Sequence, residues 1–74
     1  MKFKDFMYLY DNWNGITKVN DNNLDTIVRG RTLNIMECEE SFHPLTKVAN
    51  YGELFDMEIV AFGFYDNELC VRVK

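Results

Sequence analysis

Residues 59–74 read IVAFGFYDNELCVRVK, and this stretch decides the fold class. Two runs rich in β-branched and aromatic residues flank Asp66-Asn67, a pair that tolerates the positive φ of a two-residue hairpin turn. If Tyr65 pairs with Glu68, the two-residue period of a strand places six apolar side chains on one face. These are Val60, Phe62, Phe64, Leu69, Val71 and Val73. The stretch therefore predicts a β-hairpin that packs this face on a core, with Phe62 buried at its centre.

The opposite face of this hairpin carries uncharged side chains on the first strand and mostly charged side chains on the second. Ile59, Ala61 and Tyr65, with Gly63 among them, form a strip without charge. Two interpretations stay open, either a solvated face with scattered apolar residues or a flat patch for a partner or a second copy. A chain of 74 residues is short of core, which favours self-association. We therefore expect a homo-oligomer with Ile59, Ala61 and Tyr65 at its interface.

The remaining segments predict one helix, a second hairpin and a short second helix. Apolar residues recur at helical spacing over residues 3–13, and Asn14-Gly15 follows as a left-handed cap. Residues 16–20 and 24–31 predict two strands, with a bulge at Gly30 and a continuation of the second strand over 32–37. Residues 51–57 predict one or two helical turns. The expected fold is α+β, a single domain over residues 1–74. In it, an N-terminal helix packs on a mostly antiparallel four-stranded sheet built from two hairpins, with the short second helix before the last hairpin.

Charge and cysteine content exclude several classes of protein. The net charge is −4, and few basic residues are clustered in the sequence. Proteins that bind duplex nucleic acid need clustered lysine and arginine, so duplex binding is not expected. The apolar stretches are too short to cross a bilayer, so no membrane partner is expected. Two cysteines without a signal peptide predict free thiols and a cytoplasmic protein.

Catalytic and metal-binding patterns are incomplete. The only histidine, His43, lies five residues after Cys38, but that pair lacks the geometry of a nucleophile with its base. Cysteine and histidine spacing fits none of the usual zinc sites. The sequence therefore predicts a protein that is not an enzyme and needs no metal or other cofactor.

Three stretches carry a resemblance to known proteins: KFKDF at residues 2–6, VNDNN at 19–23 and VAFGFYDNELCVRV at 60–73. With these stretches the chain resembles small, mostly uncharacterised proteins of phages and prophages from Gram-positive gut bacteria. The resemblance implies that the chain is phage-encoded and acts in the cytoplasm of the host cell. Small phage proteins of this kind counter host defence by binding their targets in stoichiometric amounts. They block a host defence protein, or they sequester a nucleotide signal within an oligomer.

Two hypotheses for a non-enzymatic binding protein follow. In the first, a homo-oligomer sequesters a nucleotide immune signal, with Arg29 and Arg31 on its phosphate and Trp13 or Tyr51 on its ring. In the second, an acidic stretch imitates nucleic-acid charge and blocks a host defence or nucleic-acid-binding protein. That stretch consists of Glu37, Glu39 and Glu40.

Overall fold

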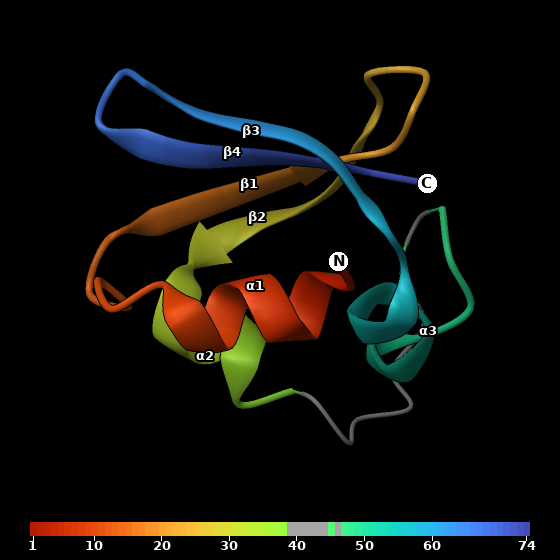
Figure 1. Ribbon diagram of the computed structural model, residues 1–74, viewed down its shortest axis with the longest axis horizontal. Coiled ribbons are helices and arrows are strands. Elements are labelled where there is room, and N and C mark those ends of the chain that lie inside the picture. Colours follow the sequence, from red (N-terminus) through yellow and green to blue (C-terminus); the bar gives the residue numbers. More distant parts are fainter. Residues whose placement is uncertain (39–44, 46) are drawn as a thin grey trace.

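The computed structural model describes residues 1–38, 45 and 47–74, which form one sheet layer and one helical layer (Figure 1). The helices are α1 (Phe3–Leu9), α2 (Thr32–Met36) and α3 (Tyr51–Asp56). The strands are β1 (Ile16–Asn20), β2 (Thr26–Arg31), β3 (Ile59–Tyr65) and β4 (Glu68–Val73). All three helices lie on the same side of the sheet in Figure 1, and the other side carries no helix.

The strand order is β2-β1-β4-β3, which makes β1 and β4 the central strands and β2 and β3 the edges. The predicted α+β class and both hairpins, β1–β2 and β3–β4, are confirmed. So is the short helix before the last hairpin, which is α3. The two hairpins join through a parallel pairing of β1 with β4, so the sheet is mixed. Local sequence patterns specify each hairpin but say nothing about which of their strands meet.

The register predicted for the last hairpin is correct next to the turn. Tyr65 pairs with Glu68, and both turn residues have positive φ, 53° at Asp66 and 65° at Asn67. The register is wrong at the far end, because a bulge between Ile59 and Ala61 places Ile59 opposite Val73. The bulge adds one residue and thereby reverses the alternation of sides.

The core lies between the sheet and the helices. Its fully buried side chains include Phe3 and Met7 of α1, Leu54 and Phe55 of α3, and Leu69, Val71 and Val73 of β4. The prediction that Phe62 is buried is wrong, since 59% of its surface is exposed. Phe62 does lie on the helical side, 4.7 Å from the Phe6 ring between centroids, but the edge position of β3 leaves it only partly covered.

The first helix is shorter than its periodicity predicts. It ends at Leu9, and the N–H of Tyr10 bonds to the carbonyls of Phe6 and Met7. The predicted left-handed cap at Gly15 is wrong, because no glycine in the described residues has positive φ. Instead, Trp13 folds back outside the helix and its indole Nε1 donates to the Met7 carbonyl at 3.0 Å.

The second strand also differs from expectation. Its irregularity lies opposite the Val19/Asn20 step, not at Gly30, and residues 32–36 form α2 instead of more strand. Two long-range contacts hold the first residue of α2 against β1 and the residue before it. The N–H of Thr32 bonds to the Gly15 carbonyl at 2.9 Å, and its buried hydroxyl lies 2.6 Å from that of Thr17.

No helix in the described part of the chain is both long enough and apolar enough to cross a bilayer. Cys38 and Cys70 are both unlinked, as predicted.

Candidate functional site

The side of the sheet without helices is the candidate site, and we call it the open face. Residues 17, 19, 69, 71 and 73 are buried against the helices, so their neighbours along β1 and β4 point the other way. The pairing register extends this face to both edge strands. Its side chains come from Ile16, Lys18, Asn20, Arg29, Arg31, Ala61, Tyr65, Glu68, Cys70 and Arg72.

Positive charge is concentrated on the open face. Its strands carry four cationic residues, Lys18, Arg29, Arg31 and Arg72, and one acidic residue, Glu68. The formal charge of this face is therefore +3, whereas the whole chain carries −4. All five charged residues of the four strands thus lie on this one face, whereas the acidic surplus of the chain lies outside the strands.

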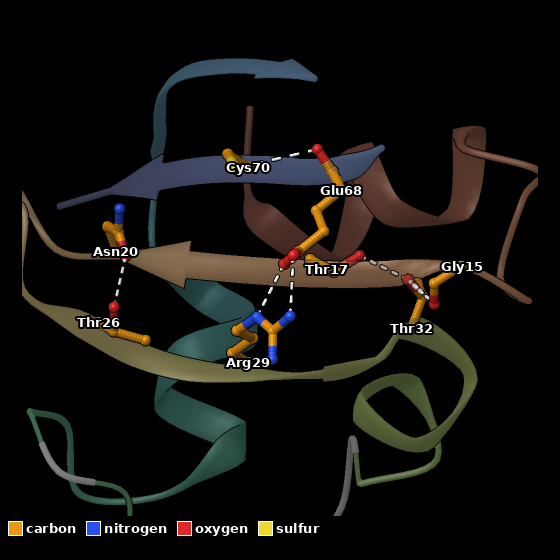
Figure 2. Close-up of polar contacts among 8 residues, drawn as sticks. All are labelled: Gly15, Thr17, Asn20, Thr26, Arg29, Thr32, Glu68 and Cys70. Atoms are coloured by element: carbon orange, nitrogen blue, oxygen red, sulfur yellow. Dashed lines mark hydrogen bonds and ion pairs between the residues drawn. The ribbon is translucent and has the colours of Figure 1, made fainter. Parts of the chain in front are cut away.

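One ion pair crosses the open face. Glu68 of β4 reaches over β1 to Arg29 of β2, and its two oxygens accept from Nε and Nη2 of Arg29 at 2.8 Å each (Figure 2). The hydrogen bond from Arg29 lowers the pKa of Glu68, and the positive charges of Arg29 and Lys18 lower it further. The hydrogen bond to Glu68 raises the pKa of Arg29, and the negative charge of Glu68 raises it further.

This pairing changes which cations are available for a ligand. The planar fork of Arg29 is occupied by Glu68. By contrast, Lys18, Arg31 and Arg72 form no ion pair within the part of the chain that the structure describes. The predicted Arg29–Arg31 couple does share one face, but Arg29 is bound by Glu68, whereas Arg31 has no ion-pair partner among the described residues.

A hollow of about 270 Å³ lies at the β3 side of the open face. Ala61, Gly63 and Tyr65 of β3, Cys70 and Arg72 of β4 and Asn20 of β1 contribute to its lining. The Tyr65 ring folds over Gly63, where an added Cβ would stand 3.0 Å from ring carbon Cε2. The Nε of Arg72 is buried and has no hydrogen-bond partner within residues 1–38, 45 and 47–74.

The two aromatic residues predicted to stack on a nucleotide lie elsewhere. Trp13 is half-buried against the core and bonded to α1. Tyr51, at the start of α3, also packs on the core. Burial raises the pKa of the Tyr51 hydroxyl, and the neighbouring Cys38 raises it further. The structure therefore joins neither ring to Arg29 and Arg31.

The predicted interface residues divide into three groups. Ala61 and Tyr65 are exposed on the open face, as expected, whereas the bulge turns Ile59 towards the core. Glu37 is exposed directly after α2. Glu39, Glu40 and His43 lie outside the described residues, so the acidic stretch stays a prediction.

Sequence reasoning missed Arg72 as a site residue. Its alternation with Leu69, Val71 and Val73 already indicated that Arg72 points away from the core. The parallel register, which places Asn20 opposite Arg72 and Lys18 opposite Cys70, had no local signal.

Comparison with known protein families, with curated proteins and with solved structures found no match. Among the described residues, no group of three or more histidine, cysteine or acidic side chains is placed to hold a metal ion. The functional argument therefore depends on the open face and on the sheet edge beside it.

Proposed function

We propose that this chain is a non-enzymatic binding protein whose open face takes an anionic small molecule. A nucleotide is the ligand class that fits the phage setting implied by the resemblance. One observation carries the proposal: a sheet face without helical cover holds a formal charge of +3 in a chain of −4. Such segregation attracts anions to one surface although the protein as a whole repels them.

The available side chains suit a phosphorylated ligand. Arginine binds phosphate through a planar fork, and lysine acts on it as a compact point charge. Arg31 and Lys18 lie in successive rows of neighbouring strands, because Lys18 pairs with Arg29 and Ile16 pairs with Arg31. Strands lie about 4.8 Å apart and alternate residues of a strand about 6.7 Å apart, so one nucleotide spans both cations.

Self-association is the second part of the proposal, and the β3 edge supports it. No residue of β3 is charged, and Phe62, Phe64 and Tyr65 are 59%, 60% and 67% exposed. In a two-residue hairpin the residues flanking the turn bond to each other, so the backbone groups of Phe62 and Phe64 point outwards. An uncharged edge with free backbone groups pairs readily with a strand of another chain. A second copy there would extend the sheet and help to enclose a ligand, as a sequestering oligomer requires.

Titration calorimetry tests ligand binding directly. We expect the purified protein to bind mono- or cyclic nucleotides at low salt and to bind them more weakly as salt rises, because phosphate contacts are screened. A Lys18→Glu/Arg31→Glu variant should lose binding by at least tenfold. Lys4→Glu on α1, in the helical layer, is the control and should bind like the parent. Absence of heat with every nucleotide at millimolar concentration would refute the proposal.

A further inference from the structure

The hollow on the open face is lined by Arg72, whose side chain has one unsatisfied donor among the described residues. The Arg72 guanidinium carries five N–H donors, and buried donors are nearly always paired in folded proteins. Yet the buried Nε of Arg72 has no hydrogen-bond partner among the residues that the structure describes. Glu68, the acidic residue two positions away on the same face, is held by Arg29 through two bonds of 2.8 Å. Because Arg29 holds Glu68, the Nε of Arg72 is left without an acceptor in the described part of the chain.

An aromatic wall stands beside this donor. Tyr65 is 67% exposed, and its ring lies over Gly63, which has no Cβ to push the ring away from the strand. Gly63 pairs with Cys70 and Ala61 pairs with Arg72, so the ring and the guanidinium lie in adjacent rows of the sheet. Alternate residues of a strand are about 6.7 Å apart. A phosphate bound in the row of Arg72 would therefore lie one such step from the Tyr65 ring, which covers the row of Gly63.

The size of the hollow limits the ligand. Its volume of about 270 Å³ lies just below the range of roughly 300–1,000 Å³ usual for drug-sized ligands. One base with its sugar and phosphate is a better match than a dinucleotide. Asn20 lines the same hollow beside Arg72 and adds an amide that can both donate and accept.

We propose that this hollow is a subsite for one nucleoside monophosphate unit, whose phosphate binds Arg72 while its base packs on Tyr65. This inference rests on the proposed function, since it locates the anionic ligand within the open face. It moves the aromatic contact from Trp13 and Tyr51 to Tyr65, and it adds Arg72 as a further phosphate ligand on the same face as Lys18 and Arg31.

Three probes separate the parts of the subsite: inorganic phosphate, adenosine and AMP. We expect AMP to bind most tightly and to shift the backbone amide resonances of residues 20, 61, 63, 70 and 72. Arg72→Gln should weaken AMP binding by at least tenfold. Arg72→Lys should recover part of that loss, because it restores the charge but not the fork. Tyr65→Leu should weaken AMP and adenosine while leaving phosphate binding unchanged.

The control removes the same charge elsewhere. Lys4→Gln, in the helical layer, should bind AMP like the parent, and the circular dichroism of all variants should show that they are folded. If the parent binds AMP and Arg72→Gln binds it equally well, the subsite is wrong while the proposed function stands. If AMP binds no tighter than phosphate, the role of Tyr65 is wrong. If no probe binds and no other nucleotide does, the proposed function fails as well.

Discussion

Leu69 and Phe64 are direct partners on the same side of one hairpin, yet their surroundings differ sharply. Leu69 on the central strand β4 is 1% exposed, whereas Phe64 on the edge strand β3 is 60% exposed. Both side chains point towards the helical layer. The centroid of the Phe64 ring lies 6.0 Å from that of Tyr10, the residue directly after α1. The comparison teaches that the face of a strand decides the direction of a side chain, while the place in the sheet decides its burial.

The largest expected effect separates these two partners. Leu69→Ala should lower the free energy of unfolding by about 2–5 kcal/mol, because it leaves a cavity in a closed core. Phe64→Ala should cost only about 1 kcal/mol, since more than half of the ring is already in water. Urea unfolding at low protein concentration measures both. Equal losses would show that Phe64 is covered in solution and would break the comparison.

The polar groups of the core extend the comparison to β1 and β2. Thr32→Val should cost about 1–3 kcal/mol, because it leaves the buried hydroxyl of Thr17 without its acceptor. Thr17→Val should cost less, since the Thr32 hydroxyl still bonds to the Gly15 carbonyl at 3.1 Å. Thermal unfolding of the two isosteric variants provides the measurement. A larger loss from Thr17→Val would mean that the hydrogen bond to Gly15 is not maintained.

The exposed edge predicts a third effect, on assembly instead of stability. The parent protein should form a dimer or larger oligomer, and Phe64→Lys should shift it towards the monomer, because a charge on an edge strand opposes strand pairing. Light scattering after size-exclusion chromatography measures the mass. Asn23→Lys in the exposed β1–β2 turn is the matched control and should leave the mass unchanged. A monomeric parent at high concentration would contradict the role proposed for β3.

The smallest expected effect concerns pH and the pair that links edge strand β2 to central strand β4. Arg29 lowers the pKa of Glu68 below its ordinary value of 4.5, so the pair stabilises the fold above that pH. This stabilisation is lost as the pH falls through the lowered pKa. Glu68→Gln should therefore unfold slightly more easily than the parent at pH 7, and this difference should shrink as the pH falls below 4.5 through the lowered pKa. Because the pair is exposed to solvent, the difference should be small. A difference that does not change as Glu68 becomes protonated would show that its origin is not the charge of Glu68.

Local patterns predicted several parts of the fold and of the site correctly. The Asp66-Asn67 turn set the register beside it, because few residues adopt positive φ without strain. Alternation placed Arg29 and Arg31 on one side of β2. The burial of Phe62 and the side of Ile59 were predicted wrongly, since a strand pattern contains neither its position in the sheet nor a bulge at its start.

The sequence by itself determined the α+β class, both hairpins and the tight turn, because these depend on residues close together in the chain. Only the tertiary structure decided that β1 lies parallel to β4, that β3 is an edge, and that Glu68 pairs with Arg29 across an intervening strand. Those features arise from contacts between residues distant in the chain. That same assembly gathers positive charge on one face of an acidic protein and leaves the buried Nε of Arg72 without a partner among the described residues.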